Sequence, residues 1–232
     1  MSINPTRHLQ VFSPQEFSKT GYLVDVIGCG ATGSHIVLSL ARLGITNIRV
    51  WDFDTVQAHN IPNQVFGLKD INRPKVAAIH DAVAAATGTS IDIRDVRFDG
   101  GPGQELGDIV FLLTDTMASR RMIWESSIKF NINIRLMVET RLGAESGKIY
   151  TINPSLLGHV QGWESTLCED RVAAPSACGA ITSVGPTAEI VSGIAVWQLM
   201  DWFRIKQGKE VELPNEVFFS VRPWMMLTRY FR

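Results

Sequence analysis

The stretch from Leu23 to Asp54 constrains the fold more than any other part of the chain. It contains a short apolar segment, the pattern G-x-G-x-x-G at residues 28–33, a helical apolar pattern, and a second apolar segment that ends at Asp52. In a strand–turn–helix–strand unit, such glycines permit the tight turn, the approach of a phosphate, and close helix packing. The helix N-terminus offers free N–H groups to that phosphate. The stretch predicts a βαβ unit that binds an adenine nucleotide, with Asp52 accepting hydrogen bonds from the ribose. A glycine-rich turn without a ligand is the alternative.

Composition narrows the class of protein. The 232 residues suffice for one sizeable core, and a net charge of -1 gives no strong field towards nucleic acid or an anionic membrane. The N-terminal sequence lacks the apolar core of a signal peptide, and the apolar run at 190–200 is shorter than the ~20 residues that cross a bilayer. Cys29, Cys168 and Cys178 form no C-x-x-C pair, which argues against disulfides and structural zinc. We expect a cytoplasmic protein with no membrane or nucleic-acid partner.

Alternating patterns indicate one domain over residues 1–232 with a doubly wound, Rossmann-like α/β sheet, mainly parallel. Residues 1–21 are expected to form an N-terminal arm, and residues 22–138 the nucleotide-binding half. In that half we expect a helix that starts near Pro74 and stops near Gly88, because proline suits a first helical turn. A further helix is expected over 117–129 and a strand over 132–138.

Residues 139–232 no longer show the regular alternation of strand and helix patterns. We expect them to hold a crossover loop and a helix–strand region. The glycines within 141–153 predict an antiparallel hairpin. We expect an irregular loop over residues 158–179. Residues 187–203 predict a helix that is buried or lies at an interface. Residues 217–221 predict the last strand, and we expect the C-terminal strands to be antiparallel.

Beyond the glycine turn, four separated motifs occur in order. They are Asp52-Phe53-Asp54-Thr55-Val56 with Asn60 and Gln64, then Lys75, then Thr114-Asp115-Thr116 with Arg120, and finally Cys178 with Gly185-Pro186. Their order and spacing resemble the ThiF/MoeB/HesA family, the E1-like enzymes that adenylate the C-termini of ubiquitin-like and sulfur-carrier proteins. The resemblance covers about residues 5–205, and Arg7-His8-Leu9-Gln10 matches the family's opening loosely.

The resemblance implies a site for ATP and Mg²⁺. A carboxylate that attacks an α-phosphate meets electrostatic repulsion, and cations around the developing charge lower that barrier. The resemblance gives catalytic roles to Lys75, to Asp115 as the Mg²⁺ ligand, and to Cys178 as a possible thioester nucleophile. It gives ATP-binding roles to Gly28, Gly30, Ala31, Gly33, Asp52, Asp54, Asn60, Asn63, Gln64, Lys75, Arg7 and Arg73.

Three departures from the family pattern stand out. Asn63 replaces the family's phosphate-binding arginine, and Arg73, or Arg7 of the partner subunit, could compensate. Thr116 replaces the asparagine that follows the key aspartate, and the zinc-binding cysteine pairs of many members are missing. Simpler readings also exist: Lys75 as a solvated lysine, Asp115 as a helix cap, and Cys178 as a small buried residue.

The motifs favour a stand-alone E1-like adenylyltransferase that activates a small β-grasp carrier protein with ATP and Mg²⁺. The acyl group then passes to Cys178 or to another acceptor. The alternatives are a tRNA-modifying ThiF-like dehydratase, a carrier-binding ThiF-like subunit without turnover, and an NAD-dependent oxidoreductase. The family forms two-fold dimers, and the apolar helix with the Trp- and Met-rich tail needs burial, so we expect a homodimer.

Overall fold

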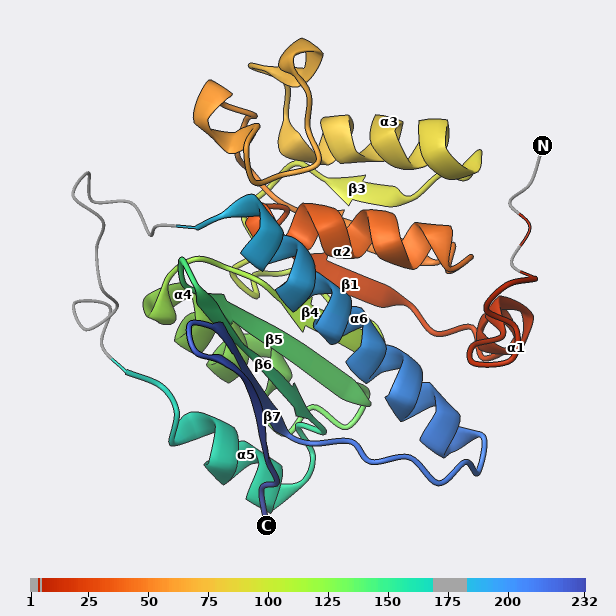
Figure 1. Ribbon diagram of the computed structural model, residues 1–232, viewed down its shortest axis with the longest axis vertical. Coiled ribbons are helices and arrows are strands. Elements are labelled where there is room, and N and C mark those ends of the chain that lie inside the picture. The colour runs from red at the N-terminus through yellow and green to blue at the C-terminus, as the bar shows by residue number, and fades with distance from the viewer. Residues whose placement is uncertain (1–3, 5, 169–182) are drawn as a thin grey trace.

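A single eight-stranded sheet organises the molecule, in the order β3-β2-β1-β4-β5-β6-β7-β8 (Figure 1). The computed structural model describes residues 4, 6–168 and 183–232. The first five strands along the chain pair in parallel and the remaining pairings are antiparallel, which confirms the predicted fold class. The strands are β1 (Val24–Ile27), β2 (Ile48–Trp51), β3 (Asp92–Arg94), β4 (Ile109–Leu112), β5 (Leu136–Leu142), β6 (Ser146–Ile152), β7 (Glu216–Val221) and β8 (Trp224–Arg229).

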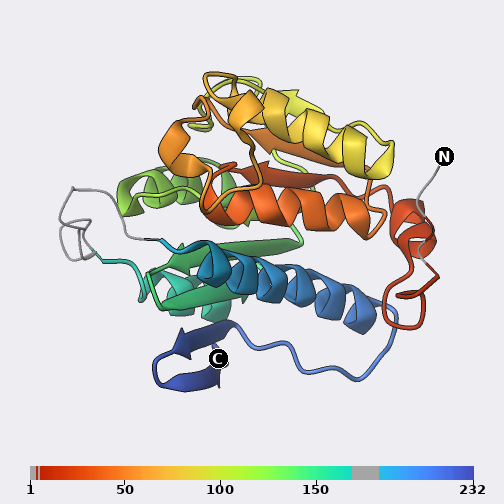
Figure 2. The same ribbon diagram turned by 45° about the horizontal axis from the view of Figure 1, so that its top comes forward.

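Helices cover both faces of the sheet. Helices α2, α3 and α6 pack together on one face, whereas α4 and α5 cover the other (Figures 1 and 2). Helix α4 continues directly into a π-helical turn, η3. The helical elements are α1 (Pro14–Lys19), α2 (Ala31–Arg42), η1 (Ala58–Asn60), η2 (Leu68–Asp70), α3 (Lys75–Thr87), α4 (Met117–Ile123), η3 (Trp124–Ile128), α5 (Leu157–Glu164) and α6 (Gly185–Lys206).

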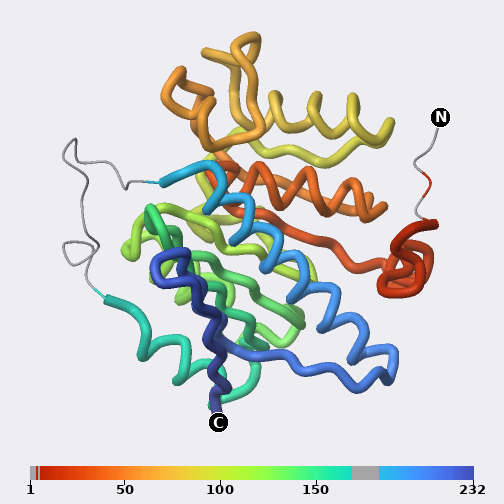
Figure 3. The backbone as a smooth tube through the Cα atoms, viewed as in Figure 1, coloured from red at the N-terminus to blue at the C-terminus, as the bar shows by residue number. Residues whose placement is uncertain are grey.

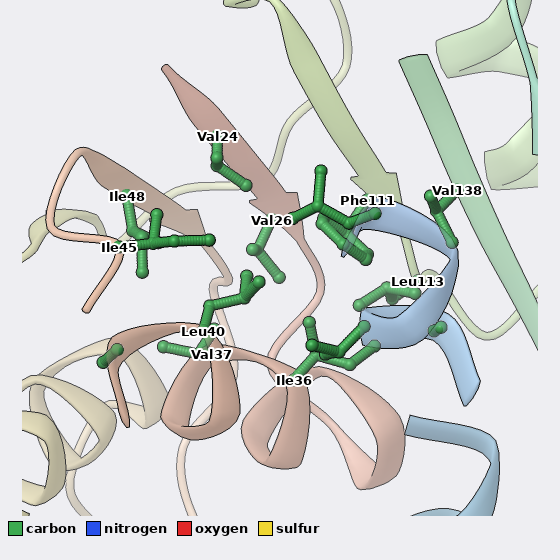
Figure 4. Packing of buried hydrophobic residues seen from close by; sticks show 14 of the residues in the cluster. Val24, Val26, Ile36, Val37, Leu40, Ile45, Ile48, Phe111, Leu113 and Val138 are labelled. Carbon is green, nitrogen blue, oxygen red and sulfur yellow. The ribbon is translucent and has the colours of Figure 1, made fainter. Parts of the chain in front are cut away.

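The core between α2 and the parallel strands fixes the glycine turn in space. Ile36, Val37 and Leu40 lie on one face of α2, because residues three and four apart share a helix face. They pack against Val26 and Phe111, which β1 and β4 direct to the same side of the sheet (Figure 4). All five side chains are fully buried. Burial of each one stabilises the folded state by about 1.5–3 kcal/mol relative to an exposed position.

Several expected elements occur where the sequence predicts them. Helix α3 ends at Gly88, whose φ of 73° is the left-handed conformation that glycine adopts without strain. Strands β5 and β6 form the predicted hairpin. The expected helix over 117–129 is present as α4 and η3, and the helix expected over 187–203 extends in both directions as α6.

Three expectations about the second half are wrong. Helix α5 occupies the first part of the segment that was expected to be irregular. In the sequence, Gly158 and Gly162 are typical of a loop. In the structure, a Cβ atom at Gly162 would collide with the Phe231 ring, so these glycines allow the C-terminal segment to pack closely on α5. Strand β7 is not the last strand, because β8 pairs with it. Strand β5 begins only at Leu136, and Ile132 is exposed.

The N-terminal arm also contains an element that was not expected. Ser13 caps helix α1, because its hydroxyl accepts a hydrogen bond from the Glu16 N–H at 3.3 Å. The Phe17 ring packs 5.1 Å from the Phe203 ring at the end of α6. The path of the chain therefore brings α1 to the opposite end of α6 from the residue where α6 begins (Figure 3).

Candidate nucleotide-binding site

The candidate site lies where the parallel strands end. Strands β1, β2 and β4 are neighbours, and each continues at its carboxyl end into a residue that the sequence singled out. In open α/β sheets, ligands bind at this edge, where the strand order reverses. Here the order reverses between β1 and β4, next to the glycine turn.

Two of the three glycines are required by packing. Gly28 has a φ of 100°, and a Cβ atom there would lie 2.7 Å from the Leu113 carbonyl oxygen. A Cβ atom at Gly33 would collide with the Gly28 carbonyl oxygen. Gly30 differs, because no atom lies within 4 Å of its Cβ position. The turn is therefore tight on its inner side and open at Gly30, which fits the close approach of a phosphate.

The start of α2 is suited to an anion. Gly30 is the N-cap residue of α2, which begins at Ala31, and among the described residues no side-chain capping hydrogen bond is made there. The first turn also carries no acidic residue that would compete for them. Free N–H groups and the positive end of the helix dipole both favour a bound phosphate.

Asp52 connects the end of β2 to the glycine turn. Its Oδ2 accepts a hydrogen bond from the Cys29 N–H at 2.6 Å, and its Oδ1 accepts one from the Asp54 N–H at 2.8 Å. Burial raises the pKa of the Asp52 carboxyl, whereas the nearby Lys75 ammonium and these hydrogen bonds lower it. These two hydrogen bonds hold the Asp52 side chain in one orientation.

Lys75 is buried, so the simpler reading as a solvated lysine is wrong. It is the first residue of α3, and its Nζ lies 2.8 Å from Asp54 Oδ2. Its backbone N–H also donates to the Asp54 carbonyl, and a bridge joins Thr55 to Pro74. The loop that leaves β2 therefore returns to place an ammonium beside the two carboxylates of the D-x-D motif.

The residues after η1 present unsatisfied polar atoms. Asn60 is used structurally, since its Oδ1 accepts from the Gln57 N–H at 2.9 Å. Asn63 Nδ2 donates to Ser183 Oγ at 2.5 Å. Asn63 Oδ1 and Gln64 Oε1 are buried without a hydrogen-bond partner in the part of the chain that the structure describes. Buried orphan groups are unfavourable, which makes both atoms candidates for ligand contacts.

Asp115 is free of the capping role. The N-cap of α4 is Thr116, whose Oγ1 accepts from the Ser119 N–H at 3.1 Å. The interpretation of Asp115 as a helix cap is therefore wrong. The Asp115 side chain is exposed, three residues after the end of β4. Within residues 4, 6–168 and 183–232, no three His, Cys, Asp or Glu side chains gather to bind a metal. A Mg²⁺ ion at Asp115 would need phosphate and water oxygens as further ligands.

The remaining predicted residues lie apart from this group. Arg73 forms ion pairs with Asp81 at 2.6 Å and with Asp70 at 3.1 Å, and these partners raise its pKa. Arg7 precedes α1, and α1 packs against Phe203 near the end of α6. At a helical rise of about 1.5 Å per residue, Phe203 lies about 27 Å from the start of α6. Arg7 therefore does not join the residues gathered near the start of α6. Cys178 lies outside the described residues.

A buried charge cluster was missed by the sequence analysis. Glu139, in the middle of β5, is fully buried. It lies 2.9 Å from Arg120 of α4 and 3.0 Å from Arg141, and it accepts a hydrogen bond from the Trp163 indole at 3.0 Å. A glutamate that directly follows the apolar run Leu136-Met137-Val138 is a signal that could have indicated this cluster.

Two hollows in the described part of the chain lie away from the glycine turn. One of about 330 Å³ lies between α5 and the last four residues, and one of about 200 Å³ lies beside α1. In the described parts of the chain, no helix has both the length and the apolar character that crossing a membrane requires.

Comparison of the sequence with protein families gives a match over most of its length. The model of the ThiF family matches residues 15–229. The "probable adenylyltransferase/sulfurtransferase MoeZ" of Mycobacterium tuberculosis is 28% identical over 110 residues, which cover 45% of this chain and 28% of MoeZ. The chain thus spans less than a third of that relative.

Solved structures share the fold at low sequence identity. The structure of E. coli MccB with ATP has a TM-score of 0.66 at 14% identity and covers 90% of this chain and 64% of that chain. The structure of PaaA has a TM-score of 0.69 at 16% identity and covers 91% of this chain and 64% of that chain. At these identities, the likeness establishes the fold alone.

Proposed function

Because the chain belongs to the ThiF family, we propose that it is an ATP-dependent adenylyltransferase of the E1-like kind. The observation that carries the proposal is the open side of Gly30 at the uncapped start of α2. A buried lysine, Lys75, and an exposed aspartate, Asp115, follow the neighbouring strands at the same edge. This donor set matches a nucleotide triphosphate better than it matches an uncharged ligand.

Each side chain has a distinct task in this proposal. Asp52, fixed by its two backbone hydrogen bonds, orients the ribose. The glycine turn and the N–H groups from Ala31 onward hold phosphate oxygens. Lys75 supplies positive charge after exchanging its Asp54 contact for phosphate. Asp115 would hold Mg²⁺, which when bound compensates charge on the α-phosphate as a carboxylate attacks.

The substrate in this proposal is the C-terminal carboxylate of a small β-grasp protein, ubiquitin-like or a sulfur carrier. Support comes from the relatives, because MoeZ is described as an adenylyltransferase/sulfurtransferase and MccB is seen with ATP. The products would be an acyl-adenylate and pyrophosphate. Transfer to Cys178 as a thioester is a further step that would require a reactive thiol at that position.

The family also allows a carrier-binding subunit without turnover. The observation that favours it is the neutral Asn63, whose amide is engaged by Ser183. The dehydratase alternative would need a basic surface for tRNA, and the net charge of -1 does not support one. The NAD-dependent alternative leaves Lys75 and Asp115 without a task.

Nucleotide binding and pyrophosphate exchange separate these alternatives. We expect calorimetric titration to detect ATP binding in the presence of Mg²⁺ and little or no NAD binding. We expect ATP–pyrophosphate exchange that depends on a small Gly-Gly-ending carrier encoded beside the gene. Tight NAD binding without ATP binding would overturn the proposal. ATP binding without exchange for any such carrier would favour the non-catalytic subunit.

A further inference from the structure

Counted over the residues that the structure describes, the buried cluster of Glu139, Arg120 and Arg141 carries an excess of positive charge. Two guanidinium groups face one carboxylate, and their side chains are at most 14% exposed. Arg141 Nε donates to both carboxylate oxygens at 3.0 and 3.1 Å. The Arg120 Nε lies 2.9 Å from the same carboxylate, yet within the described residues its N–H makes no hydrogen bond. Arg141 thus neutralises Glu139 with good geometry, and the charge of Arg120 remains in excess.

Arg120 lies close to the glycine turn. Its Nη2 donates to the Thr140 carbonyl oxygen at 3.2 Å. The Thr140 hydroxyl is in turn 3.0 Å from the hydroxyl of Thr32, which is the second residue of α2. The guanidinium is thereby connected to the first turn of α2, the predicted phosphate-binding element, by two short polar contacts.

Arg73, the intrachain residue expected to replace the arginine missing at position 63, is already compensated. Arg73 faces two carboxylates, Asp70 and Asp81, so that cluster has a net negative charge. A buried net positive charge, in contrast, is unfavourable to folding. Its presence next to a site for a polyanion therefore has a functional rather than a structural explanation.

We propose that Arg120 provides buried positive charge that favours the triphosphate of ATP and compensates for the neutral residue at position 63. The inference rests on the proposed ATP site and concerns which residue supplies its charge. Arg120 acts without touching the nucleotide, as a positioning charge within the protein. A unit charge about 10 Å away at an effective dielectric constant of about 20 changes an affinity by about ten-fold.

Opposite effects of two substitutions distinguish charge from mere structural support. Arg120→Gln removes the excess charge, so we expect the Kd for ATP with Mg²⁺ to rise about ten-fold. Glu139→Gln removes a negative charge from the same cluster, so the Kd is expected to stay equal or fall. A structural role would predict weaker binding in both variants. The matched control is Arg121→Gln, which removes a charge from the exposed side of α4 and is expected to leave the Kd within two-fold.

The measurement is calorimetric titration with ATP and Mg²⁺ at low and moderate salt, beside thermal unfolding of each variant. Arg120→Lys keeps the charge and is expected to bind ATP within about three-fold of wild type. If Glu139→Gln fails to fold, the comparison of Arg120→Lys with Arg120→Gln still distinguishes a role of charge from structural support. The inference is overturned if a folded Arg120→Gln binds like wild type, if Glu139→Gln weakens binding equally, or if Arg120→Lys loses as much as Arg120→Gln. A wild type that binds no ATP overturns the proposed function itself, and the inference with it.

Discussion

At the scale of single residues, Gly30 and Gly33 belong to the same turn but differ in the space around them. Gly33→Ala would drive a methyl group into the Gly28 carbonyl, so we expect loss of folded protein. Gly30→Ala meets no protein atom, and alanine at an N-cap costs about 1 kcal/mol. We therefore expect a folded variant whose ATP affinity falls at least ~10-fold, because the methyl group occupies the phosphate side.

Circular dichroism melts and ATP titration check this pair of substitutions. The control is Gly193→Ala on the exposed side of α6, where the Cβ position is also open. That change is expected to raise stability by roughly 0.5–1 kcal/mol and to leave ATP binding unchanged. Normal ATP affinity in Gly30→Ala would contradict the position given to the phosphates.

Asp115 separates adenylation from later transfer. Asp115→Ala removes the proposed Mg²⁺ ligand, and we expect carrier-dependent ATP–pyrophosphate exchange to fall ~100-fold or more. Cys178→Ala should leave exchange within a few-fold, because the adenylate forms before a thiol can attack. The exposed Glu210, after the end of α6, offers a control substitution to alanine. Full exchange in Asp115→Ala would rule out the mechanism.

At the scale of elements, His159 makes α5 sensitive to pH. The Asn153 N–H donates to His159 Nδ1 at 2.9 Å, so this nitrogen must be unprotonated in the folded state. Burial lowers the pKa of His159 below its ordinary value of 6.5. The unfolded chain then binds the proton more readily, so stability is retained above pH 6.5 and lost as pH falls towards the folded pKa.

Urea unfolding at pH 7.5 and 5.5 measures this effect. We expect a lower free energy of unfolding at pH 5.5, and a smaller pH dependence in His159→Gln, whose side chain accepts a hydrogen bond without titrating. Burial also lowers the pKa of His35, so some dependence will remain in that variant. An identical pH dependence in wild type and His159→Gln would show that the α5 contact does not contribute.

Elements with local signals were predictable, and those that depend on tertiary contacts were not. The βαβ unit and α3 carry their own turn glycines and apolar periodicity, so the sequence located them and the glycine turn. Helix α5 was not recognised because it contains Gly158 and Gly162, which are unusual in a helix. They are needed only because the Arg232 backbone packs on Gly158 and the Phe231 ring packs on Gly162. The Glu139 cluster was missed because two of its partners, Arg120 on α4 and Trp163 on α5, lie far from it in the sequence.

At the scale of the whole molecule, the sheet ends in an exposed apolar strand. All six residues of β8 are exposed, including Trp224 at 75%, Met226 at 57% and Leu227 at 56%. Strand β8 is also an edge strand, so its outer backbone groups are available for pairing. Exposed apolar edges of this kind mark interfaces. We expect a second copy of the chain to cover β8 in a two-fold dimer.

Light scattering at micromolar concentration tests this prediction. We expect wild type to have the mass of a dimer, and Met226→Lys to shift it towards the monomer, because a charge would be buried in the interface. Leu68→Lys is the matched control, since Leu68 is 78% exposed in η2, away from β8. If only a second copy can bring Arg7 to the phosphates, the monomeric variant should also bind ATP more weakly. A monomeric wild type would refute the dimer and remove Arg7 from the site, leaving Arg120 and Lys75 as its cations.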